Sequence, residues 1–245
     1  MNESLKTALV AMGLLVAFSC KKESSPIQSS ITTGKNPPAD LITDIDGKTY
    51  NFVFIHGQRW KTTNLAVSHY RNGDRIPQVK DSTKWAALTT GAWCWYNNDS
   101  ATGAVYGKLY NWYAVNDPRG LAPTGWHVAS NAEWDTLIAH LGGYYAFAGG
   151  RLKDTGTIEA GTGLWYAPNA YATNKTGFTG LPGGDRANDG TFANVGYHAF
   201  WWSSTPSDMY HATIYLLNYD EGGIHKGGGF DDRCGFSVRC IKDSI

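Results

Sequence analysis

The pattern of apolar positions specifies one helix over residues 130–141. Its apolar side chains recur at i, i+3, i+4 and i+7, so they form one stripe along a helix. They are Trp134, Leu137, Ile138 and Leu141. Ser130 and Glu133 have the spacing of a capping box, in which two side chains bond free backbone N–H groups at the helix start. A second helix is predicted over residues 108–115, where three apolar side chains share a face.

Alternation of apolar and polar positions predicts short antiparallel strands elsewhere in the chain. A small ribbon is expected from residues 50–55 and 59–65. The C-terminal half repeats the pattern in three segments, at residues 200–203, 210–217 and 235–240. A long Gly-, Asn- and Thr-rich stretch before residue 200 predicts irregular loops. We therefore expect an α+β domain with two main helices, a twisted antiparallel sheet and long irregular loops.

The N-terminal segment has the pattern of a secretion signal. Lys6 precedes an uncharged, mostly apolar run over residues 8–18, which suits a signal peptide and is too short to span a bilayer. A small residue, Ser19, stands directly before Cys20, and polar sequence begins immediately afterwards. This resembles the lipobox of bacterial lipoproteins, in which the cysteine becomes the acylated first residue. The alternatives are ordinary secretion with a free Cys20, or a buried apolar helix.

Three parts of the chain follow from this interpretation. Residues 1–19 are the expected signal peptide, and residues 20–42 are rich in Ser, Thr, Lys and Pro, which predicts a flexible tether. Residues 43–245 form the folded domain. We expect the protein in the cell envelope, held to the outer membrane through Cys20 and exposed at the surface or in the periplasm.

Composition narrows the class of partner. The 21 basic and 21 acidic residues cancel, which argues against nucleic acid because phosphate binding needs a cationic surface. The chain has 29 Gly, 10 Trp and 14 Tyr, and this indicates many tight turns and flat amphipathic surfaces. Such a composition is typical of loop-rich extracytoplasmic modules.

The sequence allows more than one disulfide pairing. Besides Cys20 the chain has Cys94, Cys234 and Cys240, so outside the cytoplasm one disulfide with one thiol left over is expected. Cys234 and Cys240 close a small loop in one alternative, and Cys94 pairs with either in the others.

Catalytic and metal-binding motifs are scarce. The chain has none of the nucleophile-elbow, zinc-protease or phosphate-loop patterns, and the glycine runs 161–163 and 227–229 are predicted to be loops. The seven histidines lack metal-ligand spacing. Calcium is the one cation considered, at residues 44–47 or at Asp220, Glu221 and Asp231–Asp232 with His225, but turn carboxylates in solvent are favoured. We therefore expect no cofactor and no catalytic residue.

Aromatic residues beside Asn, Asp and Arg are the candidate ligand contacts. Sugar binding uses an aromatic face for the apolar side of the ring and polar side chains for its hydroxyls. The candidates are Trp165, Tyr166, Asn169, Asp185, Arg186, Trp93 and Trp95. Five other tryptophans are expected in the core, namely Trp112, Trp126, Trp134, Trp201 and Trp202.

A series of ordered motifs runs through the predicted domain. They occupy residues 44–50, 57–60, 64–65, 72–77, 106–113, 123–128, 133–137, 177–179, 181–184, 201–204 and 235–240. In this order they resemble the Fibrobacter succinogenes major paralogous domain family of bacterial surface and secreted proteins, from about residue 43 to 243. The family often has a cysteine where this chain has Ala122, so any disulfide that uses that position is absent here.

The family is distantly similar to C-type-lectin-like domains and to formylglycine-generating enzymes. The resemblance implies a C-type-lectin-like α+β architecture without implying a shared activity. The calcium-dependent sugar motifs of such lectins are absent, so their sugar chemistry does not transfer.

Three functional hypotheses follow. The first is a non-enzymatic surface module that binds a glycan or another envelope macromolecule. The second is an oxidoreductase that resembles formylglycine-generating enzymes and uses Cys234 with Cys240. The third is a structural or adhesive envelope protein that binds other proteins.

Overall fold

The structure is a computed structural model that describes residues 42–145 and 147–243. The chain divides into two units, Met1–Asn36 and Pro37–Ile245, and every described residue belongs to the second. The predicted signal peptide, Cys20 and the tether up to residue 41 lie outside the described residues. Ile42, which the sequence assigns to the tether, is buried in the first strand.

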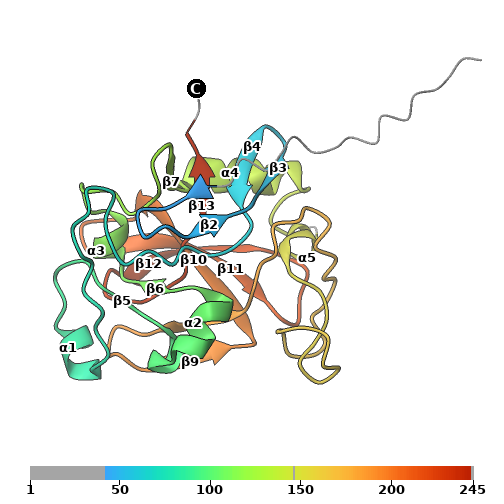
Figure 1. The fold of residues 1–245 in the computed structure, drawn as a ribbon. Coiled ribbons are helices and arrows are strands. Elements are labelled where there is room, and N and C mark those ends of the chain that lie inside the picture. The colour runs from blue at the N-terminus through green and yellow to red at the C-terminus, as the bar shows by residue number, and fades with distance from the viewer. Residues whose placement is uncertain (1–41, 146, 244–245) are drawn as a thin grey trace, which may run out of the picture. The chain divides into compact units, whose positions relative to one another are not determined.

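The described unit is built mainly from two sheets (Figure 1). The larger has the order β12 (His225–Asp231), β11 (His211–Asn218), β10 (His198–Pro206), β8 (Gly183–Arg186) and β9 (Phe192–Val195). The smaller has the order β3 (Phe52–Ile55), β4 (Gln58–Lys61), β13 (Cys240–Lys242) and β7 (Trp126–Val128). Two ribbons accompany them, β1 (Ile42–Thr43) with β2 (Thr49–Tyr50) and β5 (Trp93–Cys94) with β6 (Leu109–Tyr110).

The helices are short. They are α1 (Ser82–Ala86), a 3₁₀ turn η1 (Tyr96–Asn98), α2 (Ser100–Tyr106), α3 (Trp112–Val115), α4 (Asn131–His140) and α5 (Ala148–Leu152). The predicted capping box of α4 is confirmed, because Ser130 and Glu133 bond each other's backbone N–H groups. The α+β class is confirmed as well, and none of the described helices has the length and apolar character needed to cross a membrane.

The second predicted helix is wrong over its first half. Leu109 and Tyr110 form a strand paired with Cys94 and Trp93. Asn111 then caps α3 through a bond from the backbone N–H of Ala114, so the helix has only four residues. Tertiary pairing overrides the helical periodicity here.

Two strand predictions also need correction. The glycines at 227–229, predicted as a loop, lie inside β12, which pairs antiparallel with β11. The closing strand begins only at Cys240, because residues 235–237 make single bridges to other elements instead. The large sheet is also not wholly antiparallel, since β10 and β8 pair in parallel.

An aromatic core fills the space between the small sheet, α4 and the large sheet. The ring centroid of Trp134 lies 4.8 Å from that of Trp60 and 4.8 Å from that of Tyr215. All five tryptophans expected in the core are buried. Burying such rings is the main favourable term for folding, about 25 cal/mol per Å² of apolar surface.

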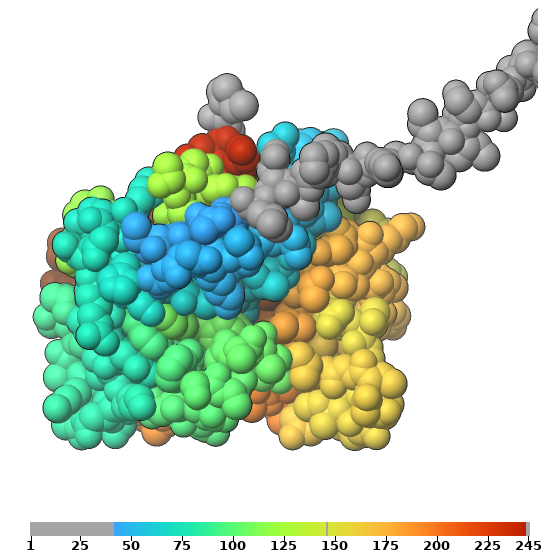
Figure 2. All heavy atoms as spheres, viewed as in Figure 1, coloured from blue at the N-terminus to red at the C-terminus, as the bar shows by residue number. Residues whose placement is uncertain are grey.

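The two ends of the described unit meet in one sheet. Trp60 in β4 pairs with Ile241 in β13, the last strand. In Figure 2 the blue residues of the first strands and the red residues of the last strand lie on the same face. A groove lined by residues of β3, β4 and β13 lies at this sheet.

Candidate functional site

The residues predicted to contact a ligand lie mostly inside the fold. Trp165, predicted as an exposed contact, is fully buried, and its indole N–H donates to the Gly180 carbonyl at 3.0 Å. Asn169 is also buried, and its amide nitrogen donates to the carbonyls of Asp154 and Gly156. The prediction of an exposed Trp165 is therefore wrong, because the backbone uses its polar atom.

Asp185 and Arg186 have structural partners too. The Asp185 carboxylate accepts a bond from Asn194 at 2.7 Å, and burial raises the pKa of Asp185. The fully buried Arg186 guanidinium donates to three carbonyls, those of Val79, Lys80 and Gly190. Arg186 thus ties β8 to distant loops and presents no open donor to a ligand.

Each of the remaining aromatic candidates packs against another aromatic ring. Trp93 is buried and donates to the Ile76 carbonyl, and Trp95, half-buried, lies edge-on to it with centroids 5.2 Å apart. Tyr166 is half-buried and stacks on Tyr197 at 4.3 Å. The predicted residues are therefore not gathered into one open site.

The predicted disulfide is not formed in the structure. Cys94, Cys234 and Cys240 are free thiols, with Cys94 and Cys240 buried and Cys234 half-buried. Burial raises the pKa of Cys234 to about 12 and also raises the pKa of Cys240. Attack of either sulfur on an external substrate is therefore disfavoured, because only the ionised sulfur is a strong nucleophile.

A groove crosses the end of the small sheet. It has a volume of about 340 Å³ and is lined by Phe54, Gly57, Gln58, Arg59, Glu133, Ile241, Lys242 and Asp243. Phe54 is 63% exposed, so its ring is open to a ligand in this groove. We therefore define this set as the end groove.

Strand register explains how the end groove is assembled. Phe54 in β3 pairs with Arg59 in β4, and Lys242 in β13 pairs with Trp126 in β7. The Trp60–Ile241 pair places Arg59 opposite Lys242. Phe54, Arg59, Lys242 and Trp126 therefore form one row across the four strands, with their side chains on the same face of the sheet.

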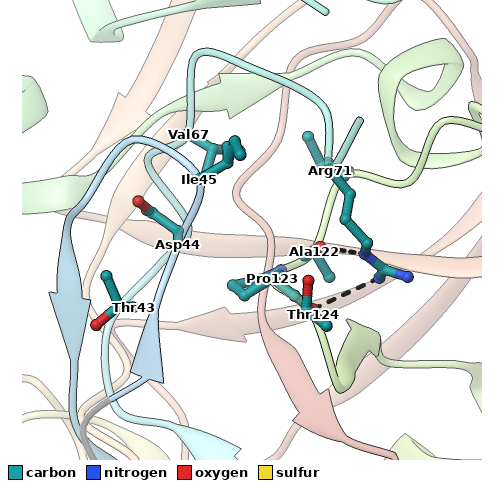
Figure 3. Close-up of a pocket in the computed structure, with 9 residues that line it drawn as sticks. Thr43, Asp44, Ile45, Val67, Arg71, Ala122, Pro123 and Thr124 are labelled. Atoms are coloured by element: carbon teal, nitrogen blue, oxygen red, sulfur yellow. Dashed lines mark hydrogen bonds between the residues drawn. The ribbon is translucent and has the colours of Figure 1, made fainter. Parts of the chain in front are cut away.

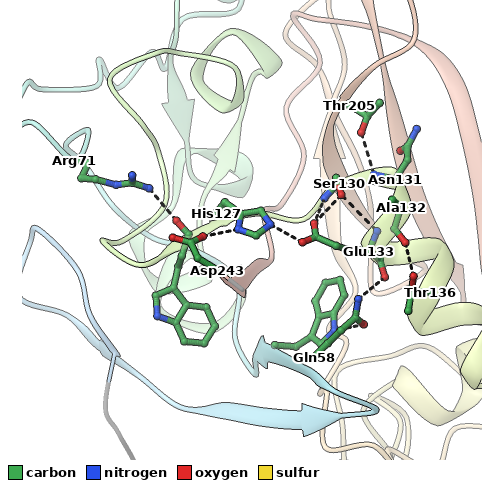
Figure 4. A network of polar contacts seen from close by, with 12 residues as sticks. Gln58, Arg71, His127, Ser130, Asn131, Ala132, Glu133, Thr136, Thr205 and Asp243 are labelled. Carbon is green, nitrogen blue, oxygen red and sulfur yellow. Dashed lines mark hydrogen bonds and ion pairs between the residues drawn. The ribbon is translucent and has the colours of Figure 1, made fainter. Parts of the chain in front are cut away.

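A polar network, shown in Figure 4, includes Glu133 and Asp243 from the lining of the end groove. The His127 ring lies between two carboxylates, with Nε2 2.6 Å from Glu133 Oε1 and Nδ1 2.6 Å from Asp243 Oδ1. The other oxygen of Glu133 accepts bonds from Ser130. The hydrogen bond to Glu133, with further help from Asp243, raises the pKa of His127.

Two cationic side chains at the rim of the end groove could donate hydrogen bonds to a ligand. The Gln58 side chain is used at both ends, because it donates to the Glu133 carbonyl and accepts from Trp60 Nε1. Arg59 and Lys242, by contrast, have no hydrogen-bonded partner among the described residues, although Arg59 lies 5.7 Å from the Phe52 ring and Lys242 6.0 Å from the Trp126 ring. The groove can therefore offer an aromatic face and two cationic donors together.

A second hollow lies under the β1–β2 turn (Figure 3). Its volume is about 190 Å³, and its lining includes Asp44, Val67, Arg71 and Ala122. The Asp44–Gly47 segment is the predicted plain turn, since Asp44 Oδ1 accepts the backbone N–H groups of Asp46 and Lys48. Arg71 is held by carbonyls, including that of Ala122 at 3.1 Å.

Comparison with known proteins identifies the family. The family model of the Fibrobacter succinogenes major domain matches residues 53–242. The chain belongs to this family. Its matched region starts inside β3 and ends at the last residue of β13, so it includes every residue that lines the end groove except Asp243. No curated protein and no solved structure matches the chain.

The sequence gives a weak signal for the end groove. Residues 52–55 are all apolar, so a ribbon built from them has apolar side chains on both faces, with two phenylalanines together on one of them. The exposed Phe54 could be found from that excess. Its neighbours Lys242 and Asp243 could not, because they join the site only through the pairing of β13 with β4, which is far away along the chain.

Proposed function

We propose that the protein is a non-enzymatic binding module, lipid-anchored to the outer membrane, whose ligand is an acidic glycan held in the end groove. One observation carries the ligand class. An exposed aromatic ring, Phe54, lies next to Arg59 and Lys242, two cations without hydrogen-bonded partners among the described residues. An aromatic face packs against a sugar ring, and guanidinium and ammonium donors bind carboxylate or sulfate groups.

The wall opposite the cations supports the same proposal. Asp243 uses one oxygen on His127, and its side chain lines the groove, where the second oxygen can accept a sugar hydroxyl. A C-type-lectin-like architecture remains part of the proposal, supported by the α+β composition of the domain. The oxidoreductase alternative gains no support from Cys234 and Cys240, whose thiol pKa values are raised by burial.

Binding of an acidic oligosaccharide tests the proposal. An oligogalacturonide and its methyl-esterified form share one backbone and differ in charge, so isothermal titration of both separates ring packing from charge recognition. Phe54→Ala should weaken binding of both forms about tenfold, equivalent to about 1.4 kcal/mol. Arg59→Gln should weaken the acidic form alone.

Tyr210→Ala is the matched control, because Tyr210 is 68% exposed and lies outside the end groove. It should bind like the wild type. Equal affinity of wild type and Phe54→Ala, or preference for the esterified form, would contradict the acidic-glycan assignment.

A further inference from the structure

A lysine and a cysteine face each other in the centre of the small sheet. Since Trp60 pairs with Ile241 in antiparallel strands, Lys61 in β4 stands directly opposite Cys240 in β13. Both side chains are fully buried. Directly opposed residues have their Cβ atoms roughly 5 Å apart on the same face of a sheet, so the amine and the thiol share one small volume.

The Lys61 amine is left without a polar partner. Its Nζ is buried and has no hydrogen-bond partner among the described residues. It lies 3.1 Å from the centroid of the Tyr50 ring. The nearby Asp44 carboxylate is already taken by the Tyr50 hydroxyl at 2.5 Å. Burial lowers the pKa of Lys61 to about 7, so much of the amine is neutral and nucleophilic near neutral pH.

This unpaired state is costly and calls for an explanation. A buried polar group without a partner costs about 1–3 kcal/mol, and an aliphatic side chain of similar length would fill the same space without that cost. Neither the end groove nor the polar network around His127 uses Lys61. The amine is therefore available for chemistry with the group opposite it.

We propose that Lys61 and Cys240 are the site of an oxidative cross-link, Lys–NH–O–S–Cys, that joins β4 to β13. The co-reactant is dioxygen. The amine loses one N–H hydrogen and the thiol loses its S–H hydrogen, while N–O and O–S bonds form and the O–O bond breaks. One oxygen atom enters the bridge and the other leaves as water. Nitrogen and sulfur each lose two electrons, and dioxygen accepts all four.

The hollow in Figure 3 borders the core cluster that contains Cys240. Val67 and Ala122 line it and belong to the same core cluster as Cys240. Asp44, at its wall, bonds the tyrosine whose ring contacts Lys61. Dioxygen is small and nonpolar, so it enters the protein without the desolvation cost of an ion.

Peptide mapping of the full-length protein tests the proposal. Purified protein is equilibrated with dioxygen or kept anaerobic, unfolded with iodoacetamide present, digested and analysed by tandem mass spectrometry. The dioxygen sample should contain a peptide pair joining Lys61 to Cys240, with a mass gain of one oxygen less two hydrogens. Alkylated Cys240 should fall in proportion. Excess dithiothreitol should release both peptides by returning the four electrons.

Two controls keep the outcome decisive. Lys61→Arg keeps a long cationic side chain without a nucleophilic amine and should give no linked peptide. Cys94 is an internal control, because this thiol is equally buried but its charged neighbour is Arg186. Full alkylation of Cys240 after dioxygen treatment of the wild type, or oxidation of Cys240 without a link to Lys61, would overturn the proposal.

Discussion

Arg239 is a single residue that connects motifs from distant parts of the sequence. Its guanidinium is fully buried and donates to the carbonyls of Lys61, Phe178 and Thr179 and to Asn64 Oδ1. The same oxygen of Asn64 accepts from Trp201 Nε1 at 2.9 Å. The motifs around residues 64, 178, 201 and 239 therefore meet in one buried network.

Arg239→Lys should be strongly destabilising. A lysine keeps the charge but has a single donor group, so it leaves buried carbonyls unpaired, at about 1–3 kcal/mol each. We expect a loss of about 3–5 kcal/mol in the free energy of unfolding, measured by urea titration. Arg59→Lys, at the half-buried rim of the end groove, is the control and should change stability by less than about 0.5 kcal/mol. Similar losses in both variants would contradict this account.

Residue composition alone does not predict which aromatic and polar residues are exposed. Trp165 and Arg186 sit beside Asn and Asp in the sequence, as sugar-binding residues do, yet the fold turns them inward onto backbone carbonyls. Irregular loops contain many unpaired backbone groups, and buried polar side chains satisfy them. A polar and aromatic composition therefore marks a loop that needs internal support as readily as it marks a binding site.

His127 joins three elements. It lies in β7 and contacts Glu133 in the first turn of α4 and Asp243 directly after β13. Hydrogen bonds to these carboxylates raise its pKa, so the protonated ring stabilises the folded state. For Glu133, burial alone would raise the pKa, but bonds from His127 and Ser130 outweigh burial and lower it.

The stabilisation that His127 provides should consequently fall as the pH rises through the raised pKa of His127. The contribution is complete below the unfolded pKa of about 6.5 and is lost at alkaline pH. His127 is 39% exposed, so solvent screening limits the effect to about 0.5–1 kcal/mol. Urea unfolding of the wild type and of His127→Asn at pH 6 and pH 9 measures it, because other titrating groups are common to both proteins. The stability difference between the two proteins should be larger at pH 6, and a difference that is equal or larger at pH 9 would refute the prediction.

Elements with complete local signals were predictable, and elements that depend on distant partners were not. Helix α4 has a cap and an apolar stripe, and the structure contains it with those features. Residues 109–110 have helical periodicity but pair with β5, and the glycines of β12 have no strand signal at all. Pairing with a long neighbouring strand, β11, is what orders that segment.

For the molecule as a whole, the sequence predicts a lipid at Cys20. Metabolic labelling with an alkynyl palmitate analogue in a Gram-negative host should label the wild type and sediment it with membranes. Cys20→Ala should lose the label and move to the soluble envelope fraction. Cys94→Ala, the matched control, should keep both properties. An unlabelled wild type, or a labelled Cys20→Ala variant, would contradict the anchor.

The central position of β13 has a consequence for the timing of export. β4 and β7 do not pair with each other, because the last strand of the chain lies between them. A secretion channel that threads the chain from its N-terminus delivers residues 240–242 near the end, so the small sheet stays incomplete for almost the whole passage. Contacts this distant along the chain also form slowly. For a chain exported as proposed, this topology would delay completion of the small sheet until β13 has emerged from the channel.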